Sequence, residues 1–277
     1  MSKNLKIRKI KSLINSYPWQ RFRCLTKDNI QNRGPIEWLD IINSAVESPL
    51  KVIKADGMKR SLKVNIIPWG VLYMEEFRWN FNRIILSPFR SSRGKRIWSF
   101  SDYLIKNQVL VPEPVIFFEI EKLIFVTKTY IATRWIDQGF DFGRLTSGKD
   151  IAFDYDFQSI LCRGVDMVIK LHNLCFVHGD LKWSNFFYIF GKDSRVILID
   201  LDSLRRCSSP YQQGRDFARY ILSAIEHQYD DIFIESLINR YLKGRGQKRS
   251  LVERSLLSRI DKKRNRYEGD LKGRFKK

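Results

Sequence analysis

One short segment, residues 178 to 202, constrains this chain more than any other. It carries Asp180, then Asn185 five residues later, and then Asp200 at the end of a β-branched apolar run. Phosphoryl transfer needs a carboxylate that orients the attacking hydroxyl, and oxygen ligands that hold magnesium against the nucleotide phosphates. Asp180 fits the first role, whereas Asn185 and Asp200 fit the second. Lys182 is placed to neutralise charge on the transferring phosphate.

The surrounding pattern predicts a β-hairpin that gathers these groups. Residues 185–190 and 196–199 are apolar runs typical of strands, and Gly191-Lys192-Asp193-Ser194 between them is typical of a tight turn. Asp180 then lies on the loop that enters the hairpin, and Asp200 lies just after it. The alternative is that these polar residues only cap loops and turns. Their ordered spacing together with the hairpin favours a phosphotransfer site.

The same residues resemble those of a known family. His-Gly-Asp-Leu-Lys-Trp-Ser-Asn at 178–185 and Ile-Asp-Leu-Asp at 199–202 are similar to motifs of the lipopolysaccharide kinases, which include Kdo and core-heptose kinases. Trp183 is the most discriminating detail, since most protein kinases lack it. The resemblance covers about residues 50 to 240 and extends to three further stretches, at 92–98, 111–115 and 215–219. It implies a protein-kinase-like fold, ATP and Mg²⁺ as cofactors, and a sugar hydroxyl as acceptor.

The fold class expected from this resemblance is α+β, with two lobes: a small β-rich N-lobe and a mainly helical C-lobe. We expect a basic, partly helical leader over 1–48, an N-lobe over 49–131, a C-lobe with the catalytic loop over 132–242, and a basic tail over 243–277.

Apolar patterning predicts individual elements within the lobes. The N-lobe should hold one helix over 93–107 and five strands, at 50–54, 62–67, 71–77, 114–119 and 123–131. In the C-lobe, apolar residues at helical spacing between 160 and 171 predict a buried helix before the catalytic loop. Residues 217–242 are also expected to be helical.

The third predicted strand carries an unusual acid. Glu75 stands where the resembling family has a Lys that anchors the nucleotide, and Ile97 stands where many members have its Glu partner. An acid near the phosphates would repel them. Three interpretations stay open. Lys63 on the preceding strand takes over as the nucleotide-binding residue, which is the one we adopt; Glu75 pairs with Lys95 or Arg96; or the chain is a pseudokinase.

Three polar residues of the second lobe are expected to support the site without reacting. His172, near a helix end, should cap or pack, and His178 should organise the catalytic loop. Asp216 could cap the helix it begins, or bind the backbone of the catalytic loop, and the second role is favoured.

The formal net charge of +20 points to anionic partners. From residue 243 to the end, 14 Lys or Arg stand against 4 Asp or Glu, a net of +10. We expect an anionic glycolipid substrate and peripheral contact with an anionic membrane surface. Residues 5–14 fit an amphipathic helix that could lie there, or else a solvated leader. Nucleic acid is an unlikely partner, because no zinc spacing or RNP-like segment is present. The oligomeric state stays open.

The four cysteines form no Cys-x-x-Cys pair, which is typical of reduced thiols in a cytoplasmic protein. No apolar run approaches the roughly 18 residues that span a bilayer. We therefore expect a cytoplasmic protein, with the inner face of the cytoplasmic membrane as a site of peripheral contact.

The predicted function is ATP-dependent phosphotransfer to a sugar hydroxyl, Kdo or heptose, of a lipopolysaccharide-core-type glycolipid. The alternatives are a membrane-associated pseudokinase without turnover, and a small-molecule phosphotransferase of the aminoglycoside or choline type.

Overall fold

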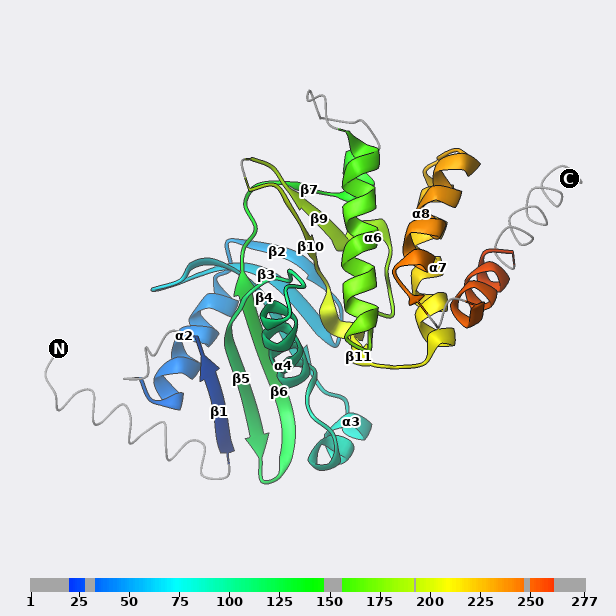
Figure 1. Cartoon of the computed structure of the whole chain (residues 1–277). Coiled ribbons are helices and arrows are strands. Elements are labelled where there is room, and N and C mark those ends of the chain that lie inside the picture. The colour runs from blue at the N-terminus through cyan, green and yellow to red at the C-terminus, as the bar shows by residue number, and fades with distance from the viewer. Residues whose placement is uncertain (1–19, 28–32, 147–155, 192, 247–249, 262–277) are drawn as a thin grey trace, which may run out of the picture. The chain divides into compact units, whose positions relative to one another are not determined.

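The computed structural model describes residues 20–27, 33–146, 156–191, 193–246 and 250–261 (Figure 1). It forms two compact units: the first comprises the chain up to Ile105 together with Pro112–Ile136, and the second comprises Lys106–Val111 together with the chain from Asp137 onward. The predicted amphipathic helix at 5–14 and the last sixteen residues of the predicted basic tail, 262–277, lie outside the described residues.

The first unit is built on one antiparallel sheet of six strands, in the order β1-β5-β6-β4-β3-β2 (Figure 1). The five predicted strands are all present, with slightly different ends. The bounds are β1 Gln20–Thr26, β2 Lys51–Ala55, β3 Lys59–Ile66, β4 Gly70–Arg78, β5 Pro114–Lys122 and β6 Phe125–Arg134.

Strand β1 lies within the predicted leader, residues 1–48, and makes part of it a strand of the sheet. It pairs with β5 along its whole length, from Gln20 opposite Lys122 to Thr26 opposite Ile116. Phe22 and Cys24 pack against the core of the unit, whereas Arg23 reaches Glu121 at 2.8 Å. This alternation follows the two-residue period of a strand, but it is too short and too basic to stand out in the sequence.

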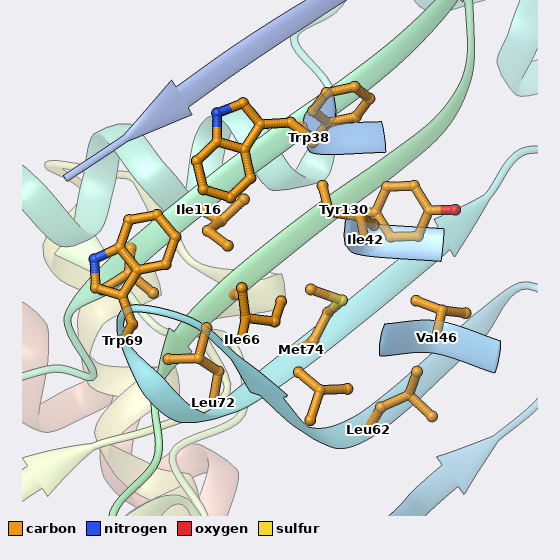
Figure 2. Packing of buried hydrophobic residues seen from close by; sticks show 14 of the residues in the cluster. Trp38, Ile42, Val46, Leu62, Ile66, Trp69, Leu72, Met74, Ile116 and Tyr130 are labelled. Atoms are coloured by element: carbon orange, nitrogen blue, oxygen red, sulfur yellow. The ribbon is translucent and has the colours of Figure 1, made fainter. Parts of the chain in front are cut away.

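The helices of this unit are α2 Pro35–Glu47, α3 Phe81–Leu86 and α4 Arg93–Lys106, with a 3₁₀ turn at Ser87–Phe89. Helix α2 also falls inside the predicted leader, and it covers one face of the sheet. Figure 2 shows its side chains Trp38, Ile42 and Val46 packed against Leu72, Met74 and other apolar residues of the strands. The predicted leader therefore supplies a large part of the core of this unit.

Helix α4 packs on the opposite face of the same sheet. Phe117 and Ile131 are paired across β5 and β6, and successive strand residues point to opposite faces, so they face away from Ile116 and the α2 core. A Cβ atom at Gly94 would lie 2.5 Å from Thr129 Cγ2 and 3.2 Å from Phe117. Glycine at this position therefore allows the close approach of the helix to the sheet.

The second unit is mainly helical. Its helices are α5 Phe142–Thr146, α6 Phe157–Asn173, α7 Pro210–Glu226 and α8 Asp231–Lys243. Two small sheets complete it: β10-β9-β7, with β7 Phe140–Asp141, β9 Phe186–Ile189 and β10 Arg195–Leu198, and β11-β8, with β8 Phe176–Val177 and β11 Arg205–Arg206. The predicted hairpin is β9 and β10, and α6 contains the predicted buried helix.

The carboxyl-terminal part agrees with the expected helical structure and adds detail to it. Residues 217–242 are helical except at a break: α7 ends at Glu226, and Asp230 caps helix α8 by accepting from the Phe233 amide at 2.7 Å. The predicted tail also includes a helix over 250–261 that buries Val252, Leu256 and Ile260. These residues recur every four positions and so form one apolar face, which the many Lys and Arg residues around them obscured.

No helix in the described part of the chain is both long and apolar enough to cross a membrane.

We predict that Ile42→Ala lowers the free energy of unfolding of the first unit by about 2–5 kcal/mol, because it leaves a cavity between α2 and the sheet. Ile42 is fully buried, whereas Ile53 on β2 is 43% exposed. Ile53→Ala is the matched control and should cost about 1 kcal/mol or less. Denaturant titration followed by tryptophan fluorescence measures both, and equal losses would contradict the assignment of the core.

Candidate active site

The loop between β8 and β9 carries the predicted catalytic residues. It begins at His178 and ends in a 3₁₀ turn, Trp183–Asn185, which leads directly into β9. Gly179 has a φ of +87°, and a Cβ atom there would come within 3.0 Å of Ser203. Since L side chains rarely adopt this backbone conformation, glycine is required for the turn that presents Asp180.

The Asp180 carboxylate lies among three nitrogen donors. Lys182 Nζ is 2.9 Å from Oδ2, Asn185 Nδ2 is 3.3 Å from the same oxygen, and Arg219 Nε of α7 is 3.8 Å from Oδ1. The side chain of Asp180 is 37% exposed, so it can meet a substrate hydroxyl while these donors fix its direction. The structure thus brings Asp180, Lys182 and Asn185 together, as the sequence predicted.

Asp200 is joined to this group through the backbone. The Ile199 amide donates to the Asn185 carbonyl at 2.9 Å, and His178 Nε2 lies 3.1 Å from the Ile199 carbonyl oxygen. Asp200 follows in a left-handed conformation, with a φ of +58°. These bonds fix the residue before Asp200 to the loop that carries Asn185 and Asp180.

Asn185 and Asp200 have the chemistry of a magnesium site. Asn185 uses its Nδ2 to bind the Asp180 carbonyl oxygen at 2.8 Å, which leaves its amide oxygen as the ligand atom. Within the described residues, no group of three or more His, Cys, Asp or Glu side chains is arranged to hold a metal by itself. Carboxylate and amide oxygens are ligand types that magnesium accepts.

The buried carboxylate of Asp216 binds the backbone of the catalytic loop. Its Oδ2 accepts from the His178 amide at 2.7 Å, and its Oδ1 accepts from the Gly179 amide at 2.8 Å. The favoured role of Asp216 as a binder of the loop backbone is therefore confirmed. The capping alternative is wrong, because α7 begins six residues earlier at Pro210 and is capped by Ser209.

His172 and Tyr241 complete this buried network. His172 Nε2 lies 3.1 Å from Asp216 Oδ2, and its Nδ1 contacts the Tyr241 hydroxyl. Burial lowers the pKa of His172 despite the opposing effect of Asp216, which favours the neutral ring. In the neutral ring Nε2 carries the proton, because an ionised carboxylate only accepts, and Nδ1 then accepts from Tyr241. Burial alone would raise the pKa of Asp216, but the hydrogen bonds and charge interactions with His172 and His178 outweigh it and lower that pKa.

Trp183 anchors the loop on α7 and the residues after it. Its ring is 1% exposed and stacks on His227 with 5.2 Å between ring centroids, and its edge contacts involve Tyr220 and Tyr229. Its amide donates to Ser223 Oγ at 3.3 Å. Trp183 therefore anchors the part of the loop that separates Lys182 from Asn185.

In the first unit, the structure pairs Glu75 with a residue that the sequence did not suggest. Lys59 Nζ of β3 lies 2.7 Å from Glu75 Oε1, and the Tyr73 hydroxyl donates to the same oxygen at 2.9 Å. The predicted nucleotide residue, Lys63, lies opposite Tyr73 in the β3–β4 register, and its ammonium sits 4.2 Å above the centre of the Trp135 ring.

Comparison with known proteins decides the family. A family model described as the lipopolysaccharide kinase (Kdo/WaaP) family matches residues 75–241, which is more than half of the chain. The chain belongs to the lipopolysaccharide kinase (Kdo/WaaP) family. It is thus a kinase of lipopolysaccharide biosynthesis, and membership implies ATP as the phosphate donor and a divalent metal.

The solved structure of a WaaP protein agrees with this assignment in fold. A structure of WaaP in complex with acyl carrier protein is 15% identical, with a TM-score of 0.66, and the match covers 88% of this chain and 98% of that one. The Mycobacterium tuberculosis PknI kinase domain is 14% identical, with a TM-score of 0.44, over 76% of this chain and 95% of that one. No curated protein matches the sequence. The predicted protein-kinase-like fold, with a β-rich and a helical lobe, is confirmed by the WaaP match.

Two contacts of this Kdo/WaaP-family kinase, those of Arg219 and Lys59, were not predicted from the sequence. Arg219 follows Asp216 by three residues, so both lie on one face of α7, and this spacing was a signal that could have placed it near the loop. Lys59 gave no such signal, because only strand register brings it to Glu75.

We predict that Asp216→Ala lowers the free energy of unfolding of this kinase by roughly 3–5 kcal/mol, because it leaves the loop amides and His172 without their buried partner. Thermal or denaturant unfolding at pH 7 measures the loss. Asp166→Ala is the matched control, since that carboxylate bonds Arg240 at 2.7 Å with its side chain 44% exposed, and it should cost about 0–1 kcal/mol.

The same pair of variants gives a check by pH. Because the pKa of Asp216 lies below its usual value of 3.8, its contribution is complete above that pH and is lost as the pH falls through the lowered pKa. The difference between wild type and Asp216→Ala should not shrink from pH 7 to 5. Asp216 raises the pKa of the buried His172, so its loss can only widen the difference as His172 titrates. A difference that disappears within this range would contradict an ionised, buried Asp216.

Proposed function

We propose that this chain transfers the γ-phosphoryl group of ATP to a sugar hydroxyl, of Kdo or heptose, on a lipopolysaccharide-core-type glycolipid. The observation that carries the proposal is the Asp180 carboxylate, held between Lys182 and Asn185 on a loop that Asp216 fixes by two backbone bonds. A carboxylate preorganised in this way suits a step that depends on positioning and charge.

Asp180 orients the acceptor hydroxyl and receives its proton. The hydroxyl oxygen forms a bond to the γ-phosphorus as the bond from that phosphorus to the bridging oxygen breaks, and ADP departs with the electron pair. Lys182, already 2.9 Å from Asp180, stabilises negative charge on the transferred group. Arg219 acts beside it as a positioning residue for the carboxylate.

Asn185 and Asp200 are the proposed magnesium ligands. When bound, the metal neutralises phosphate charge and aligns the nucleotide. The amide oxygen of Asn185 suits this role because the amide nitrogen is engaged by Asp180.

Lys63 is the proposed nucleotide-binding residue of the first unit. It lies opposite Tyr73, and opposed residues of antiparallel strands share a face, so Lys63, Tyr73 and Glu75 lie on one face of the sheet. The acid that would repel phosphate is already neutralised there by Lys59 at 2.7 Å. Lys63 has an aromatic contact with Trp135, which a phosphate can replace at lower cost than a buried ion pair.

The net charge of +20 supports an anionic glycolipid as substrate, and peripheral contact with the inner face of the cytoplasmic membrane. The Glu75–Lys59 pair also favours a second candidate, a pseudokinase, because it occupies the position of the family's nucleotide-anchoring lysine. The two candidates differ in turnover.

We predict that wild type phosphorylates Kdo–lipid A or a heptose-containing lipopolysaccharide in the presence of Mg·ATP, and that Asp180→Asn lowers kcat by about 10²–10⁴. Phosphate incorporation into the glycolipid is the measurement. Asp193→Asn is the control: this exposed residue of the β9–β10 turn should leave kcat unchanged.

Each alternative function gives its own result in that assay. Absence of turnover together with retained ATP binding would support the pseudokinase. Turnover of a neutral soluble acceptor that is independent of lipid and insensitive to salt would support a small-molecule phosphotransferase, because screening should weaken recognition of an anionic amphiphile.

We further predict that Lys63→Met raises the KM for ATP about tenfold or more, since a hydrogen bond to a charged group contributes about 1.5–3 kcal/mol. The double variant Lys59→Met/Glu75→Gln removes the neighbouring pair without leaving a buried charge, and should keep the wild-type KM. The opposite pattern would assign the nucleotide contact to Lys59.

A further inference from the structure

A strongly basic cavity lies in the first unit, between α4 and the residues that connect it to β4. Its volume is about 740 Å³, and five cationic side chains line it: Arg78, Arg90, Arg93, Lys95 and Arg96. None of its lining residues in the described chain is Asp or Glu. We call it the α4 cavity. The proposed catalytic, metal and nucleotide residues are all absent from its lining.

Three of these cations occupy an unfavourable place on α4. Arg93, Lys95 and Arg96 lie in its first turn, which contains no acidic residue. The N-terminal end of a helix carries partial positive charge from unpaired amides, so cations there repel it and an anion is attracted. Ser92 satisfies one of these amides by accepting from Lys95 N at 3.2 Å, but its hydroxyl brings no negative charge.

Arg96 also belongs to the cavity wall. Its side chain is partly exposed, and it follows Lys95 in the first turn of α4. A partly exposed guanidinium can bind two phosphate oxygens at once through its fixed fork of N–H groups.

Carboxylates outside the cavity are shared among several basic groups. Arg78 reaches Glu76 at 3.2 Å, but the same carboxylate also binds Arg60 at 3.3 Å and Lys128 at 3.2 Å. Glu119 lies near Lys95, and burial raises the pKa of Glu119. The lining of the α4 cavity itself contributes five cations and no carboxylate.

Part of the cavity wall is apolar. Phe77, Trp79, Leu86 and Phe100 line it together with the cations, and Arg93 lies over the Phe77 ring at 5.7 Å. A lining of arginines and aromatic rings suits a ligand that joins phosphate oxygens to an apolar or sugar body. A free inorganic anion would make no apolar contact with the aromatic part of the wall.

We propose that the α4 cavity binds a phosphate group of a lipid-anchored, phosphorylated glycolipid. This inference rests on the proposed function only for the choice of ligand; the anion site itself follows from the cavity. Each arginine donates two N–H groups to phosphate oxygens, and the aromatic residues contact the attached sugar or acyl part. The kinase would then recognise its acceptor at two places, the reacting hydroxyl and a phosphate already present.

The test measures binding of the full chain to lipid A in dodecylmaltoside micelles, with dephosphorylated lipid A in the same detergent as the matched ligand. Arg93→Gln/Arg96→Gln and, separately, the exposed Arg90→Gln are the cavity variants. Lys51→Gln removes one equal charge from β2, outside the cavity. We expect the Kd for lipid A to rise about tenfold or more in the double variant and several-fold in Arg90→Gln, but to be unchanged in Lys51→Gln.

Three results would overturn the inference. Equal weakening by Lys51→Gln would show diffuse attraction by net charge. Equal binding of dephosphorylated lipid A would exclude phosphate recognition. Pyrophosphate that binds as tightly as lipid A, and loses affinity in the same variants, would show a site for free phosphate. Arg90→Gln tests an exposed position, so a folding defect of the double variant does not decide the outcome.

A parallel measurement with Asp180→Asn separates this inference from the proposed function. Lipid A affinity should be the same in wild type and in Asp180→Asn, because Asp180 does not line the cavity. If wild type shows no turnover but the cavity variants still lose lipid A binding, the proposed function fails and the phosphate site stands. Normal turnover with lipid A affinity unaffected by the cavity variants would refute the phosphate site alone.

Discussion

The catalytic loop depends on one buried carboxylate. Asp216 accepts two backbone amides from the loop, at 2.7 and 2.8 Å, and a third bond from His172. A buried charge is tolerated only where hydrogen bonds replace the lost water, and here those bonds come from the segment that must be rigid. Asp216, which would be costly to bury alone, therefore fixes the backbone directly before Asp180.

In the first unit, the buried acids Glu75 and Glu76 form ion pairs with basic side chains of the sheet. Lys59 meets Glu75, and a single carboxylate, Glu76, is shared by Arg60, Arg78 and Lys128. Part of the excess of Lys and Arg in this chain thus serves the interior of the sheet. Another group of cations lies around the first turn of α4, where the lining of the cavity contains no carboxylate, and this contrast supports the proposal of a ligand there.

Strands β2 to β6 and helices α4 and α6 could be predicted, because each shows a clear period of two residues or of about 3.6. Strand β1 and the helix at 250–261 could not, since basic residues dominate their sequences and their few apolar side chains acquire meaning only when a neighbour covers them. For β1 that neighbour is β5, about a hundred residues away along the chain. Basic composition indicated a leader and a tail. Packing makes β1 part of the first unit and the helix at 250–261 part of the second.

For the site, the sequence by itself determined which groups are present and their order: Asp180, Lys182, Asn185 and Asp200 lie on one loop and one hairpin, so local spacing was enough to place them on adjoining segments. Only the tertiary structure decided how they are held. Arg219 comes from a helix distant in sequence, and its contact depends on helix packing. Lys59 lies on the strand directly before that of Glu75, and strand register decides that the two meet. Packing and register of this kind are not encoded by a local pattern.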